Sequence, residues 1–121
     1  MTPAEMSLME LLAHALLQNG RPAKAVTLLE ALDVIRPEQP QILRALAVAL
    51  LRAGHPQDAL QTLDRLALAG GVDATFHLLR SQALGGLQRA PEAMAAMRTF
   101  VELRTAQAQA QPASAPETPK A

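Results

Sequence analysis

The stretch Gly54-His55-Pro56-Gln57-Asp58-Ala59 is typical of the turn between two antiparallel helices, since glycine ends a helix well and proline suits the first position of the next. A counterpart, Gly20-Arg21-Pro22-Ala23-Lys24-Ala25, lies earlier in the chain, and we call the spacing from Gly20 to Gly54 one repeat. A weaker third copy, Gln88-Arg89-Ala90-Pro91-Glu92-Ala93, has its last alanine one repeat after Ala59, although its proline is displaced by one position. Helical hairpins that recur with a period of about 34 residues stack side by side. The sequence therefore predicts an all-α fold built from about three hairpins.

The composition of the 121-residue chain agrees with a helical protein of one domain. Half of the residues are hydrophobic, mostly Ala and Leu, and only 2% are aromatic, so local preference favours helix throughout. The absence of cysteine excludes disulfides, thiol catalysis and thiolate metal sites, and suits a reducing compartment. Eleven basic and eleven acidic residues are interspersed along the chain. We therefore expect no nucleic acid partner, because there is no basic field to hold a phosphate backbone.

Proline, glycine and capping residues divide the chain into six expected helices. Thr2, Pro3 and Glu5 form a capping-box pattern at the first helix, and Asp73 is a good cap for the fifth. The helices are expected at about 3–18, 22–35, 40–53, 56–69, 74–86 and 91–104. They form a domain over residues 1–105, with repeats at about 6–39, 40–73 and 74–105. Residues 106–121, rich in Ala, Gln, Ser and Pro, are expected to be a disordered tail, and one further turn of helix near Gln107 stays open as an alternative.

Small residues recur where the two helices of each hairpin should cross. One column holds Ala13, Ala47 and Ser81, and a second holds Ala25, Ala59 and Ala93. A small side chain permits the close approach of two helices that buries larger neighbours. The neighbours expected to be buried in this way are Leu12, Leu16, Leu46, Leu50 and Leu84.

Catalytic and metal-binding motifs are missing from the sequence. It contains no Gly-x-Ser-x-Gly, no phosphate-binding glycine loop and no His-Glu-x-x-His. The three histidines, His14, His55 and His77, fall in unrelated positions of the repeat, and the carboxylates follow helix surfaces. We therefore expect a protein that is not an enzyme, with no catalytic residues, no metal site and no cofactor.

Two surfaces are candidates for binding another polypeptide. In a right-handed stack of hairpins, the first helix of each unit lines the concave side. Apolar residues are expected on the floor of this groove and polar ones at its rim, which suits an amphipathic helix or an extended segment. The groove residues predicted are Leu17, Gln41, Arg44, Val48, Leu51, Arg52, Leu78 and Gln82. The second candidate is a stripe on the sixth helix, Met94, Met97 and Val101, which a seventh helix would normally cover.

The N-terminus has no basic segment followed by an apolar run, and no apolar stretch has the length needed to span a bilayer. We expect a soluble, cytoplasmic protein without direct insertion into a membrane.

The motif Gly20-x4-Ala25-x2-Leu28-Leu29-x-Ala31-Leu32-x4-Pro37, followed by a second Gly-x4-Ala unit, resembles tetratricopeptide repeats. Together with the closing Phe100-Val101-Glu102-Leu103-Arg104, it resembles the small three-repeat chaperones of bacterial type III secretion, of the YscY/SctY type. The resemblance covers about residues 7–104. It implies a short right-handed tetratricopeptide solenoid that binds a small secreted component, of the YscX/SctX type, and engages the cytoplasmic domain of the export gate.

Other functions remain open from the sequence. One alternative is a chaperone of needle or translocator subunits of the same secretion systems. Another is a general tetratricopeptide scaffold or adaptor, self-associating through the sixth helix as a homodimer when it has no partner. Adaptors that clamp a C-terminal carboxylate are disfavoured, because Glu10, His14 and Val48 replace the Lys, Arg and Asn that such a clamp needs.

Overall fold

The computed structural model describes residues 1–110. Within them the chain forms six α-helices and no strand, which confirms the predicted all-α fold. The helices are α1 (Pro3–Gln18), α2 (Pro22–Ile35), α3 (Pro40–Arg52), α4 (Pro56–Leu68), α5 (Ala74–Gly86) and α6 (Ala90–Ala110). The first five agree with the expected bounds to within one residue.

Prolines and glycines set the helix boundaries as their chemistry predicts. Each of the first four helices starts with a proline, whose missing N–H would have had no partner in the first turn. After α1, α3 and α4 the chain turns through Gly20, Gly54 and Gly70, with φ of 73°, 84° and 85°, a region that glycine enters without steric cost. Asp73 caps α5 by accepting a hydrogen bond of 2.9 Å from the backbone N–H of Phe76.

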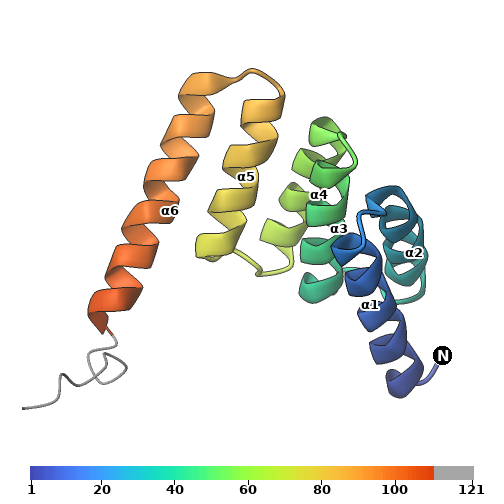
Figure 1. Ribbon diagram of the computed structural model, residues 1–121. Helices are drawn as coiled ribbons and strands as arrows, with labels where there is room; N and C mark the ends of the chain where they lie inside the picture. Colours follow the sequence, from blue (N-terminus) through green and yellow to red (C-terminus); the bar gives the residue numbers. More distant parts are fainter. Residues whose placement is uncertain (111–121) are drawn as a thin grey trace, which may run out of the picture.

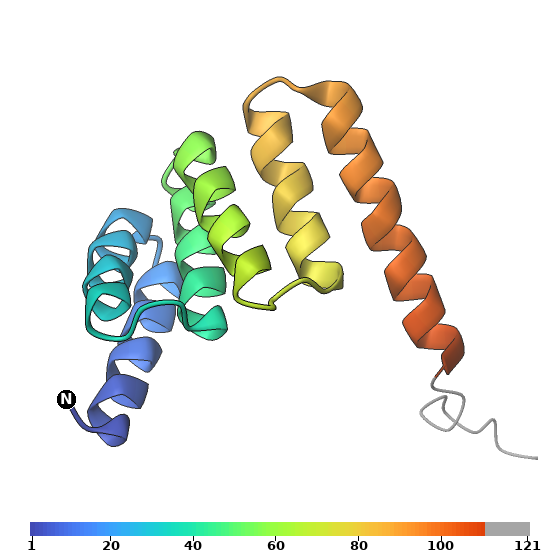
Figure 2. The same cartoon turned by 180° about the vertical axis from the view of Figure 1, so that it is seen from behind.

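The helices form three hairpins stacked in a row. Each helix packs against the next along the chain, so that α2 joins the first hairpin to the second and α4 joins the second to the third. In addition, α1 contacts α3 and α3 contacts α5. Figure 1 shows the result, a short solenoid with α1 and α2 at one end and α6 at the other, and Figure 2 shows the same order from behind.

The core is a continuous stack of Leu and Ala contributed mostly by α2 to α5. Ala25 and Ala59, predicted to lie at helix crossings, are fully buried, as are Leu29 and Leu63 beside them. Among the described helices α6 contributes least, with Ala96 as its one buried residue. The last helix is therefore attached along one narrow face.

Two of the leucines expected in the core are not buried. Leu12 is exposed and Leu16 is half-buried, whereas Leu46, Leu50 and Leu84 are buried as predicted. Leu46 occupies the position of Leu12 in the next repeat, on α3, which packs against the preceding helix α2. Within the described residues no helix precedes α1, so the same position of the repeat is left open.

The end of the last helix also differs from the prediction. α6 continues to Ala110 instead of ending near Arg104, so residues 106–110 are helical and not part of a disordered tail. The residues beyond Arg104 alternate Ala with Gln after Thr105, and both are good helix formers. The remainder of the expected tail, residues 111–121, lies outside the described part of the chain.

None of the described helices is both long enough and apolar enough to cross a bilayer.

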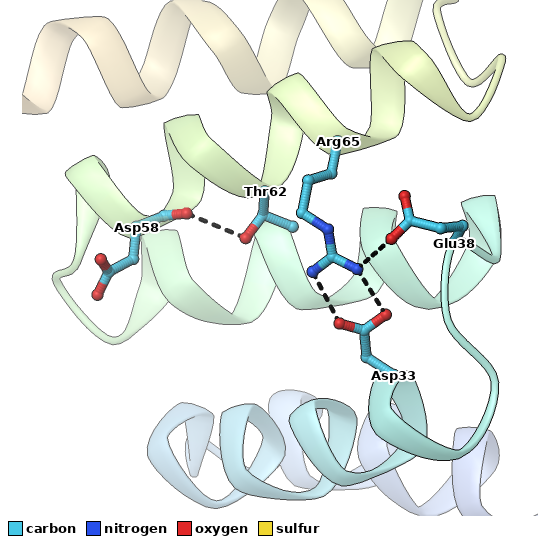
Figure 3. Close-up of polar contacts among 5 residues, drawn as sticks. All are labelled: Asp33, Glu38, Asp58, Thr62 and Arg65. Atoms are coloured by element: carbon cyan, nitrogen blue, oxygen red, sulfur yellow. Dashed lines mark hydrogen bonds and ion pairs between the residues drawn. The ribbon is translucent and has the colours of Figure 1, made fainter.

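A cluster of charged side chains ties the first two hairpins together (Figure 3). Arg65 on α4 donates hydrogen bonds of 2.7 and 3.0 Å to the two carboxylate oxygens of Asp33 on α2. It donates a third, of 2.6 Å, to Glu38 in the turn before α3, where the backbone takes a φ of 61°. These carboxylates, Asp33 first, raise the pKa of the Arg65 guanidinium above its ordinary value, so the arginine stays charged.

On the same helix, the Thr62 hydroxyl donates to the Asp58 carbonyl oxygen at 3.0 Å.

Candidate partner-binding surfaces

The predicted groove residues of α3 and α5 share one side of the stack. On a helix, positions three or four apart lie on one face, which places Gln41, Val48 and Arg52 together on α3. Leu78 and Gln82 occupy the corresponding face of α5, and α3 contacts α5 directly. Val48, Leu51 and Leu78 are half-buried, whereas Gln41, Arg52 and Gln82 are exposed. We call these six residues the inner surface: an apolar strip with polar side chains beside it.

Arg44, also predicted at the groove, makes contacts within the chain. Its guanidinium Nη2 donates hydrogen bonds of 3.3 Å to the Gly71 carbonyl oxygen and to the Asp73 carboxylate. Asp73 in turn caps α5. Arg44 thus reaches from α3 to the start of α5 and holds the two helices of the inner surface in register.

Leu17 does not belong to the inner surface. Its side chain is only 7% exposed and faces the core together with Met6 and Ala13. These three residues are spaced by seven and four positions, so they share one face of α1, and this face is covered by the rest of the stack. The position of Leu17 in the repeat predicts a side chain open to the groove, but the packing of the first hairpin buries it.

The stripe predicted on the sixth helix is exposed in the structure. Met94 is 64% exposed, and Met97 and Val101 are also open to solvent. Together with Arg98 and Glu102 they line an open depression whose surface is almost entirely apolar. We call Met94, Met97 and Val101 the α6 face. Methionine side chains adapt their shape, which suits a binding surface.

A third apolar surface was missed by the sequence analysis. Leu8, Leu11 and Leu12 on α1 are exposed, Leu8 by 60%, on the side of the helix opposite Met6 and Ala13. We call these three leucines the α1 face. A comparison of repeats could have found it, since Ile42 occupies the position of Leu8 in the next repeat and is buried on α3, a helix that packs against the preceding α2.

Charged groups lie near the starts of the two end helices. Arg89, just before α6, holds the Glu92 carboxylate through hydrogen bonds of 2.8 and 2.7 Å and lowers its pKa. The backbone N–H of Thr2 donates to Glu5 at 2.8 Å, and this bond, followed by that of the Thr2 hydroxyl, lowers the pKa of Glu5. Within residues 1–110 no group of three or more His, Asp or Glu side chains is arranged to hold a metal ion. The described surfaces are therefore apolar strips with scattered charges.

The repeat geometry agrees with a known protein family. A family model described as tetratricopeptide repeat matches residues 16–83, more than half of the chain. The chain belongs to the tetratricopeptide repeat family. A search of curated proteins finds no match. Tetratricopeptide repeats mediate protein–protein interactions, so membership points to a scaffold or adaptor.

Proposed function

We propose that this tetratricopeptide protein is a cytoplasmic chaperone of type III secretion. Its client would be a small secreted protein of the export apparatus, of the YscX/SctX type, which it would help present to the export gate. The proposal rests on the resemblance of residues 7–104 to the YscY/SctY type. One observation supports it from the structure: the inner surface joins an apolar strip to exposed polar side chains across two adjacent helices.

The chemistry of the inner surface favours a segment with an apolar side. Val48, Leu51 and Leu78 offer half-buried hydrocarbon surface, which an amphipathic helix or extended strand of a client could cover. Arg52 and Gln82 can pair with polar groups of the client at the edge of such a contact. Since Arg44 fixes α3 against α5, the surface is already formed before binding.

Co-expression with the proteins encoded beside it, followed by purification through a tag on this chain, tests the proposal. A neighbouring gene product with an apolar segment should copurify, and Val48→Glu and Arg52→Glu should reduce its recovery. Arg52 is exposed, so its charge reversal should not affect folding. Leu68→Glu is the matched control, because Leu68 is 89% exposed on α4, away from the inner surface. Recovery of the chain alone, without any neighbour, would contradict the proposal.

The α6 face favours a second candidate, a general scaffold that assembles through the ends of its repeat stack. Met94, Met97 and Val101 are more exposed than the apolar strip of the inner surface. Under this alternative, Arg52→Glu would leave all associations intact, whereas Met94→Glu would disrupt them. The same purification therefore separates the two functions.

A further inference from the structure

The first and last helices of the stack, α1 and α6, each carry one of the two surfaces that form the contact between neighbouring hairpins. We call this contact, which occurs twice within the chain, the joint. Within the chain, the second helix of one hairpin packs against the first helix of the next: α2 against α3, and α4 against α5. Among the described residues, α6 is a second helix that no hairpin follows, and α1 is a first helix that no hairpin precedes. Figure 1 shows them at opposite ends of the row.

Met94 and Met97, two of the three residues of the α6 face, correspond to buried residues of the preceding repeat. Met94 and Met97 occupy the positions that Leu60 and Leu63 hold in the preceding repeat. Leu60 is 9% exposed and Leu63 is fully buried in the core, on α4, which packs against the following helix α5. The methionines therefore occupy positions of the repeat that a following first helix covers elsewhere.

The α1 face corresponds to the opposite half of the same joint. Leu8 occupies the position that Ile42 holds in the second repeat and Phe76 in the third. Both of these equivalents are buried, Ile42 to 1% exposure, and both lie on first helices that pack against the second helix of the preceding hairpin. Leu12 shows the same relation to buried Leu46. The α1 face is thus shaped for a second helix of this repeat type.

We propose that two copies of this chain associate head to tail, with the α6 face of one copy on the α1 face of the next. The occupant of each face is a second copy because the chain itself presents both halves of the joint, with apolar residues on each. Such a contact is heterologous: each copy in the pair retains one free end, so longer rows can form. This inference does not rest on the proposed chaperone function, since it leaves the inner surface free.

The internal joint also fixes the direction of the contact. A Cβ at Gly86, at the end of α5, would lie 3.0 Å from the Cβ of Pro56, at the start of α4. By the repeat offset, Pro56 corresponds to Ala90 and Gly86 to Gln18. Ala90 at the start of α6 is therefore expected beside Gln18 at the end of α1 in the next copy, with the two helices antiparallel.

Analytical ultracentrifugation of complementary variants tests the contact. The wild-type chain, 12.9 kDa, should at least double its average mass as its concentration rises. Leu8→Glu and Met94→Glu should each sediment as monomers. Their equimolar mixture should form heterodimers, because Leu8→Glu keeps an intact α6 face and Met94→Glu keeps an intact α1 face. Leu68→Glu, the control, should behave as wild type. Circular dichroism of each variant checks that the helices are retained.

Other arrangements give different results in the same experiment. A symmetric contact between two α6 faces would leave Leu8→Glu dimeric and would give no hetero-association in the mixture. A wild-type chain that stays monomeric at every concentration would show that another occupant, such as a different protein or the chain's own residues 111–121, covers the faces. Either result would overturn the proposal.

Disulfide trapping gives an independent readout, since the chain has no cysteine of its own. Under mild oxidation, a mixture of Gln18→Cys and Ala90→Cys should form a cross-linked pair, because the two Cβ atoms are expected to be neighbours. The 3.0 Å of the internal joint has to widen by only about 0.5 Å to reach the Cβ separation of a disulfide. Each variant alone should not cross-link. Cross-linking of Ala90→Cys with itself at a rate equal to that of the mixture would contradict the head-to-tail contact.

Discussion

Arg65 on α4 holds Asp33 on α2 through two parallel hydrogen bonds, 2.7 and 3.0 Å long. The two residues are 32 positions apart and belong to different hairpins. The planar guanidinium fits the carboxylate in a fork, an arrangement that fixes orientation as well as distance. Since Glu38 in the intervening turn binds the same arginine, one side chain connects α4, α2 and the chain between the hairpins.

Replacement of this arginine should loosen the first joint of the stack. Arg65→Met keeps most of the aliphatic length but removes all three hydrogen bonds, leaving the largely buried Asp33 carboxylate without its partner. Because the guanidinium itself is partly exposed, we expect a loss of about 1 kcal/mol in the free energy of unfolding, measured by urea denaturation. Arg98→Met is the matched control, since Arg98 is exposed and forms no ion pair within residues 1–110. An equal effect of both variants would contradict the role of Arg65.

Ala59→Phe should destabilise the middle hairpin. Ala59 is fully buried where α3 and α4 cross, so a phenyl ring there must displace its neighbours. We expect a loss of about 1–3 kcal/mol, seen as a lower midpoint of thermal unfolding. Ala31→Phe is the control, because Ala31 is exposed on α2. An unchanged midpoint for Ala59→Phe would mean that the crossing tolerates a large side chain.

Two glycines should respond to alanine in opposite directions. A Cβ at Gly71 would lie 2.8 Å from Leu66 Cγ and 3.2 Å from the Leu66 carbonyl oxygen, so Gly71→Ala should lower stability. A Cβ at Gly85, within α5, meets nothing within 4 Å. Gly85→Ala should therefore raise stability by about 0.5–1 kcal/mol, because alanine is the better helix former. The midpoints of thermal unfolding of the two variants measure both changes in stability. A lower midpoint for Gly85→Ala would show that this helix end needs glycine.

The ion pair at the start of α6 predicts a pH dependence. The pKa of Glu92 is lowered by Arg89, so its contribution to stability is present above the ordinary glutamate pKa and is lost as the pH falls through the folded-state value. Arg89→Gln should raise the pKa of Glu92 toward its usual range, as measured by NMR titration of the carboxyl carbon. Glu5 provides an internal control, since Thr2 lowers its pKa and the substitution should leave it unmoved. A pKa of Glu92 that does not change would exclude Arg89 as its cause.

The turns and helix bounds could be predicted from the sequence because their signals are local. Gly20 adopts a positive φ after the end of α1, and Pro22 starts α2; each follows from the chemistry of that one residue. Gly54 and Pro56 repeat this pattern between α3 and α4. The end of α6 was placed too early, because the Ala and Gln residues after Thr105 were assigned by composition to a tail although they favour helix.

Packing between hairpins was harder to predict than the helices themselves. The position of Leu17 within the repeat predicts that it lies in the groove. The repeat pattern does not encode how tightly the first hairpin packs there, and in the structure this packing buries Leu17. The α1 face was missed because Leu12 is expected to be buried by the close approach of α1 and α2 at their small residues, whereas the equivalent buried residue Leu46 lies on a helix that also packs against a preceding one. The contact of Arg65 with Asp33 depends on the relative rotation of two helices, and no local pattern encodes that rotation.

Because the joint between hairpins is the same kind of contact each time, the length of this protein is adjustable. A tandem duplication of residues 40–73 would create one new joint, in which α4 of the first copy, carrying Leu63, packs against α3 of the second copy, carrying Ile42. Both residues are already buried in the present chain. No new surface chemistry would be needed for such a gene to encode a longer, folded protein. Growth by whole units is thus open to this sequence, whereas the insertion of a few residues within a helix would shift every later position out of the repeat register.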